Sequence, residues 1–278
     1  MATTDTSMTT TPKTQTTPVQ FSLYKSGIFL LSSYVIALLL TTVFHEGGHA
    51  IALASISIPS RLVLNPFGSS MAMPLSPIPQ DFLVYAVIAG TALELLFGTC
   101  MILLFWHFRS SRLVPLLACG PMAYLKSGGY FLVGTSVEGG DTALMISLGI
   151  PEVVVYSLGL LFIIIGSVMM LLLFPLFGIS RDISFRDLFI VLFIGLIPHG
   201  IGMIIFALVA NPLALSIGIA NVLSMLLTVT ILTVIYVKKN TFLDRISHTE
   251  TSKIDQNGLL AIIAFAVIFI VIELLLFN

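Results

Sequence analysis

Long apolar segments separated by short polar loops are the feature that most constrains how this chain folds. Seven of them are long enough to cross a bilayer core of about 30 Å, and they cover residues 24–50, 82–106, 113–133, 153–177, 187–210, 213–237 and 259–277. In lipid, every backbone N–H and C=O must be satisfied inside a helix or a closed barrel, and these segments are too long for barrel strands. The sequence therefore predicts an all-α, polytopic integral membrane protein with about seven transmembrane helices.

The composition agrees with this class and excludes others. Hydrophobic residues make up 57% and charged residues only 9% of the 278 residues, whereas roughly a quarter of a soluble domain is charged. A net charge of -1 gives no basic excess for binding phosphates, so we expect no nucleic-acid partner. Cys100 and Cys119 lack the spacing of a disulfide scaffold or a thiolate zinc site. The lipid bilayer is the expected partner, and a prokaryotic cell membrane is the default location because no targeting feature is present.

Three regions are expected along the chain. Residues 1–21 form a Thr-rich tail, predicted to be disordered because it has too few large apolar residues to offset the entropy of ordering. Residues 22–151 contain the first three apolar segments, and residues 152–278 contain the last four. With the N-terminus inside, ten of the twelve Lys and Arg lie in cytoplasmic segments, and the outer loops carry only Arg61. This bias predicts an N-inside orientation.

A metal-binding motif, FHEGGH at residues 44–49, stands near the end of the first apolar segment. His45 and His49 are four residues apart, so on a helix their imidazoles project from one face and can bind one divalent metal ion. Glu46 lies beside them, where its carboxylate can take a proton from an attacking water. A polar seam between helices is the alternative interpretation. The two glycines would either admit another backbone close to the metal or allow close helix packing.

A catalytic zinc site usually has three protein ligands, so a third ligand is expected. Asp141 is the favoured candidate, because it lies just beyond the third apolar segment. The first and third segments run in the same direction, which places their C-terminal ends on the same side of the membrane. The alternative role of Asp141 is to cap a helix that begins at Thr142. Glu138 is a reserve ligand or a partner for an imidazole N–H.

These residues resemble the site-2 protease family of intramembrane zinc metalloproteases, the M50 class. In that family an HExGH motif lies inside a transmembrane helix and an Asp further along the chain is the third ligand; here Asp141 follows His49 by 92 residues. The resemblance implies a Zn²⁺ ion bound by His45, His49 and Asp141, with Glu46 as the general base. It also implies a three-helix metalloprotease core within residues 24–150 and a transmembrane protein as substrate.

Two further charged residues, Glu94 and Lys126, lie inside apolar segments. Glu94 ends the sequence AGTALE, residues 89–94, which loosely resembles the Gly-Pro-x-x-Asn stretch on the next core helix of that family, with Glu in place of Asn. An ion pair between Glu94 and Lys126 is the favoured interpretation, because an unpaired charge inside the membrane is very costly. A catalytic role, as electrophile or proton carrier, is the alternative.

The predicted function is therefore that of an intramembrane zinc metalloprotease, which hydrolyses peptide bonds in or near transmembrane segments of membrane proteins. The alternative is a non-catalytic membrane protein, either an ion transporter or a metal-binding pseudoprotease that serves as a scaffold. Transporters often have duplicated, inverted halves with broken helices, which this sequence does not show. Glu46 would also have no obvious purpose in metal binding alone.

Overall fold

The computed structural model describes residues 23–65, 70–108, 113–136, 140–179, 183–210, 215–237 and 256–276. Within these ranges the chain is mostly helical, and each of the seven apolar segments forms helix. The predicted disordered tail, residues 1–21, and the reserve ligand Glu138 lie outside the described residues.

The first three apolar segments form four helices: α1 (Leu23–Ser55), α2 (Gln80–Phe108), α3 (Val114–Leu117) and α4 (Cys119–Val133). The third segment is thus divided at Ala118, where one continuous helix was predicted. Pro121 gives a physical reason for the division, because it has no N–H to donate to the carbonyl of Leu117 one turn earlier. Ala118 keeps helical dihedral angles, so α3 and α4 follow each other with little change of conformation.

After α4 the chain forms the short 3₁₀ helix η2 and the short helix α5, and then the four remaining apolar segments. Their bounds are η2 (Gly134–Ser136), α5 (Asp141–Ser147), α6 (Glu152–Leu173), the 3₁₀ helix η3 (Phe174–Phe177), α7 (Phe185–Ala210), α8 (Leu215–Val237) and α10 (Gln256–Leu276). Pro198 lies inside α7, which continues through it.

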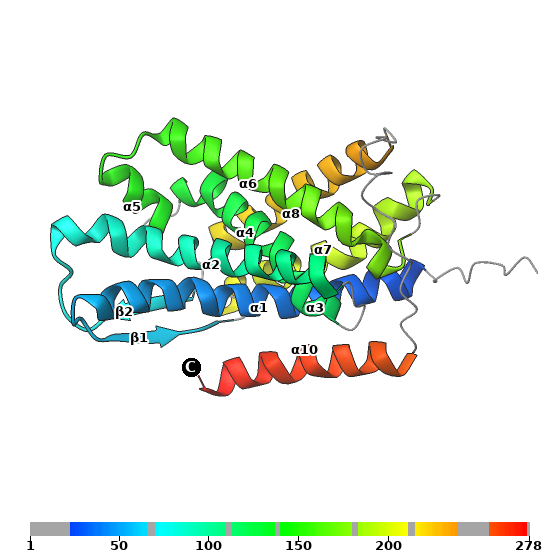
Figure 1. Ribbon diagram of the computed structural model, residues 1–278, viewed down its shortest axis with the longest axis horizontal. Helices are drawn as coiled ribbons and strands as arrows, with labels where there is room; N and C mark the ends of the chain where they lie inside the picture. Colours follow the sequence, from blue (N-terminus) through cyan, green and yellow to red (C-terminus); the bar gives the residue numbers. More distant parts are fainter. Residues whose placement is uncertain are drawn as a thin grey trace, which may run out of the picture.

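The all-α prediction needs one correction, a two-stranded antiparallel sheet between α1 and α2. Its strands are β1 (Ser60–Val63) and β2 (Met71–Pro74), with Ser60 opposite Pro74. The two strands satisfy each other's backbone groups and pack against α1, as Figure 1 shows. The connection between the first two long helices is therefore hydrogen-bonded along part of its length.

Helix α1 has a central place in the bundle, since it contacts α2, α4, α7 and α10. Figure 1 shows the long helices lying side by side along the long axis, with α10 along one side of α1. Helix α4 also packs closely on α6: a Cβ at Gly128 would lie 2.8 Å from the carbonyl oxygen of Gly159. Small residues at such crossings let two membrane helices approach at backbone distance.

Four helical stretches are long and apolar enough to cross a membrane: Leu23–Ser55, Gln80–Leu104, Glu152–Phe177 and Phe185–Gly202. Large apolar side chains are also exposed on outward faces, among them Val153 on α6 and Ile268 on α10. A water-soluble protein rarely exposes so many large apolar side chains, whereas lipid would cover them. Length and exposure together support a membrane location.

Candidate metal centre

Helix α1 presents both histidines of the HEGGH motif on one face. Successive turns place His45 and His49 so that their Nε2 atoms are 3.2 Å apart. The rings meet edge to face, with their centroids 4.9 Å apart. Both side chains are largely buried, and His45 is 8% exposed. The i, i+4 spacing therefore gives the convergence of imidazoles that the sequence motif requires.

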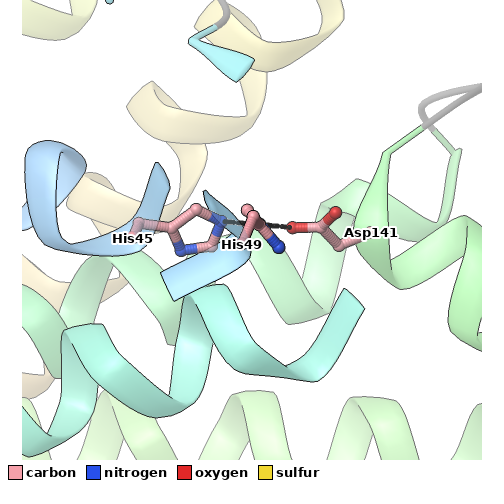
Figure 2. A group of neighbouring side chains, drawn as sticks. All are labelled: His45, His49 and Asp141. Atoms are coloured by element: carbon pink, nitrogen blue, oxygen red, sulfur yellow. Dashed lines mark hydrogen bonds and ion pairs between the residues drawn. The ribbon is translucent and has the colours of Figure 1, made fainter. Parts of the chain in front are cut away.

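Asp141 brings a carboxylate to the two histidines from the first residue of α5. Its Oδ2 lies 3.1 Å from Nε2 of His45 and 3.2 Å from Nε2 of His49. Figure 2 shows the three side chains converging. The capping role considered for Asp141 does not apply, because Gly140 is the N-cap residue and no side chain caps the helix.

The backbone of Asp141 is held in place by helix α4. The N–H of Asp141 donates to the hydroxyl of Tyr130, with nitrogen and oxygen 2.9 Å apart. The ring of Tyr130 also faces the ring of His45 edge to face, at a centroid distance of 6.4 Å. Tyr130 thus connects the start of α5 to the histidine helix, a role that the sequence analysis did not assign.

Helix α2 supplies acceptors for the other ring nitrogens of both histidines. Nδ1 of His49 is 2.7 Å from the carbonyl oxygen of Ala86, and Nδ1 of His45 is 2.8 Å from Oε2 of Glu94. A carbonyl oxygen and an ionised carboxylate only accept hydrogen bonds, so each Nδ1 carries the proton and donates it. In neutral histidines, both Nε2 atoms then present lone pairs toward Asp141.

Glu94 forms the predicted ion pair with Lys126, which the structure confirms. Nζ of Lys126 is 3.0 Å from Oε1 of Glu94. The angles are not those of a directed hydrogen bond, so the contact is chiefly one of opposite charges. Ser127 places its hydroxyl 3.4 Å from the other carboxylate oxygen, Oε2. Glu94 has no exposed surface, and its negative charge is balanced within the bundle.

The three converging atoms fit a tetrahedral metal ion. Zinc bonds of roughly 2.0–2.1 Å put neighbouring ligand atoms about 3.3 Å apart, and the separations here are 3.1, 3.2 and 3.2 Å. Three lone pairs facing one another at this distance also repel unless a positive charge lies among them. The donor set, two imidazoles and one carboxylate, is one that zinc commonly takes.

Comparison of the chain with known protein families, curated proteins and solved structures finds no match. The functional interpretation therefore depends on the residues of the site, their geometry and the sequence motif.

The charge state of Asp141 suits a metal ligand. Burial alone would raise the pKa of this carboxyl. Without a metal ion, a proton on Nε2 of a charged His45 or His49 is donated to Asp141, and these hydrogen bonds hold the pKa of Asp141 well below its ordinary value. Asp141 is therefore ionised at neutral pH, which is the form that binds a metal ion.

Glu46 lies beside these ligands on α1 and is 6% exposed. Within the part of the chain that the structure describes, its carboxylate forms no hydrogen bond or ion pair with another side chain. A buried carboxylate without such a partner is available to exchange a proton with a water or a substrate.

The glycines of the motif have different surroundings. A Cβ at Gly48 would lie 2.3 Å from the carbonyl oxygen of Ala89, whereas a Cβ at Gly47 would meet nothing within 4 Å. Gly48 therefore permits close packing of α1 on α2, which agrees with the interpretation of the glycines as helix-packing residues. On α2, Gly90 makes room for a ligand, because a Cβ there would lie 2.3 Å from Nε2 of His49.

Proposed function

We propose that this protein is a membrane-embedded zinc metalloprotease that hydrolyses peptide bonds in or near transmembrane segments of other proteins. The proposal is carried by one observation: Nε2 of His45, Nε2 of His49 and Oδ2 of Asp141 converge at metal-ligand spacing. Glu46 stands next to them, and among the described residues no side chain forms a hydrogen bond or ion pair with its carboxylate.

His45, His49 and Asp141 would hold the zinc ion. When bound, zinc acts as a Lewis acid that activates water and polarises the scissile carbonyl. Three protein ligands leave room in a tetrahedral site for a fourth. The ligands come from two separate elements, α1 and α5, so the site depends on the tertiary fold and not on the HEGGH helix alone.

Glu46 is the proposed general base. It follows His45 directly on α1, and its carboxylate would accept a proton from the attacking water and later donate it to the leaving amine. Its burial keeps bulk water from competing for that proton. This assignment separates a protease from a metal-binding scaffold, because a scaffold would need the three ligands and would not need Glu46.

The location of the site supports the proposed substrate class. The ligand-bearing helix α1 and the neighbouring helix α2 are two of the stretches long and apolar enough to cross a membrane. A substrate that reaches this site from the lipid would itself be a transmembrane segment. The resemblance of the motif to site-2 proteases supports a transmembrane substrate. For the protein itself, we propose seven membrane crossings with the N-terminus inside.

Zinc content per purified chain in detergent is the first test. We expect about one zinc in the wild type and in Glu46→Gln, and little zinc in His49→Ala and Asp141→Ala, because each of the latter removes one of three ligands. Wild-type protein without zinc, or zinc retained by both ligand variants, would overturn the proposed site.

Cleavage of transmembrane substrates is the second test. With zinc loading equal, Glu46→Gln should lower the cleavage rate by about 10²–10⁴-fold, the usual contribution of a general base. Equal cleavage by the wild type and Glu46→Gln would remove the proposed role of Glu46. A zinc-loaded wild type that cleaves no transmembrane segment, tested across a peptide library, would favour the scaffold.

A further inference from the structure

We propose that Glu94 is a positioning residue, paired with Lys126, that fixes the ring of His45 and strengthens it as a metal ligand. The inference rests on the metal site proposed above. It adds a buried charge pair at the Nδ1 edge of the His45 ring, away from the metal side. It concerns metal affinity, which can be measured without a substrate.

The contact between Glu94 and His45 fixes the ring. Oε2 of Glu94 is 2.8 Å from Nδ1 of His45, and the carboxylate has no exposed surface. The two nitrogens lie on different edges of the imidazole. A proton held at Nδ1 therefore leaves the lone pair of Nε2 directed at the metal side. A carboxylate behind a ligating histidine sets the orientation of the ring and makes it a stronger electron donor.

The second histidine shows that orientation alone does not require a charge. His49 donates its Nδ1 proton to the carbonyl oxygen of Ala86, 2.7 Å away, which is a neutral acceptor. An ionised carboxylate inside a membrane bundle is far more costly than a carbonyl that the helix already provides. The use of Glu94 at His45 is therefore explained by its negative charge and not by geometry alone.

Lys126 makes the buried charge tolerable. Each oxygen of Glu94 has its own partner: Oε1 lies 3.0 Å from Nζ of Lys126, and Oε2 faces His45. Lys126 is on α4, so the pair also joins the two helices that flank the histidine helix. Removing one member of a buried pair leaves an uncompensated charge, while removing both members is often tolerated.

The test is a titration of the purified, metal-free protein in detergent with Co²⁺, whose visible absorption reports the ligand field. We expect Glu94→Gln, which keeps the shape of the side chain and loses its charge, to weaken Co²⁺ binding by about 10–100-fold and to shift the absorption bands. Glu94→Ala should weaken binding at least as much. Glu152→Gln is the matched control, because Glu152 is an exposed carboxylate on α6, and it should bind like the wild type.

The double variant Glu94→Gln/Lys126→Met keeps the test informative if the single variant does not fold. It removes both charges, so we expect a folded protein, checked by thermal unfolding, with the same loss of Co²⁺ affinity as the loss of Glu94 alone. Wild-type affinity and spectrum in a folded variant without the Glu94 carboxylate would overturn this inference and leave the proposed function standing. Failure of the wild type to bind Co²⁺ or Zn²⁺ would overturn both.

Discussion

The substitution Gly90→Ala tests the architecture of the site with a single methyl group. A Cβ at this position would lie 2.3 Å from Nε2, 2.5 Å from Cε1 and 2.8 Å from Cδ2 of His49. The added atom would therefore meet the edge of the ring that faces Asp141. Ordinary contact requires about 3.5 Å between such atoms, so the ring or helix α2 would have to move by about 1 Å.

A movement of this size should greatly weaken metal binding. Metal–ligand distances tolerate deviations of only about ±0.2 Å, and displacing His49 would also strain its hydrogen bond to the carbonyl of Ala86. We expect Gly90→Ala to weaken zinc binding by at least about 100-fold, comparable with the loss of a ligand. Overpacking costs about 1–3 kcal/mol of stability, partly offset by the gain of about 1 kcal/mol in helix propensity from Gly to Ala. The variant should therefore fold.

Gly47→Ala is the control for this experiment. It introduces the same change on the histidine helix, where a Cβ would meet nothing within 4 Å. We expect unchanged zinc binding and a thermal midpoint equal to or above that of the wild type. The assay is zinc content per chain together with Co²⁺ titration, and unfolding is followed by circular dichroism in detergent. If Gly90→Ala binds metal as tightly as the wild type, the placement of His49 against α2 is wrong.

Three further predictions concern a support of Asp141, the packing of α4 on α6, and the stabilisation of the fold by zinc. Tyr130→Phe removes the acceptor of the Asp141 N–H and should weaken zinc binding by about tenfold, since a lost buried hydrogen bond costs about 1–3 kcal/mol; Tyr156→Phe, at an exposed hydroxyl, should not. Gly128→Ala places a methyl group 2.8 Å from the Gly159 carbonyl oxygen. It should lower the free energy of unfolding, measured by thermal unfolding, by about 1–3 kcal/mol, while the folded protein binds zinc like the wild type. Removal of zinc with a chelator should lower the thermal midpoint of the wild type but not of Asp141→Ala, because a ligand that binds only the folded state stabilises it.

The helical content of the chain and the shared face of His45 and His49 could be predicted from patterns in the sequence. Apolar length predicts helices in lipid, and a spacing of four predicts that His45 and His49 share a face. The ion pair between Glu94 and Lys126 was also predictable, because a charge inside a membrane segment requires a partner. The shared direction of the first and third segments predicted that Asp141 could reach the histidines, and the need for a third ligand and the resemblance of the motif selected it.

Other features depend on tertiary contacts that no local pattern encodes. The acceptor for His49 is the backbone carbonyl of Ala86, and every residue has a carbonyl, so nothing in the sequence distinguishes this one. Tyr130 was likewise indistinguishable from a tyrosine packed in the bundle until α5 was placed against α4. The sheet of β1 and β2 was missed because its strands have only four residues each, too short for their periodicity to stand out beside long apolar helices.

The contacts of α2 with the site nevertheless form one pattern. Ala86, Gly90 and Glu94 are spaced by four residues, so they lie along a single stripe of the helix. The first binds Nδ1 of His49, the second leaves space for the ring of His49, and the third binds Nδ1 of His45. One helix thus presents an acceptor, a gap and a charged acceptor to two histidines spaced by four on its neighbour. Because the contact residues of α2 and the histidines of α1 share a spacing of four residues, α2 contacts both rings at once. A rotation of α2 about its axis would therefore disturb both histidines together.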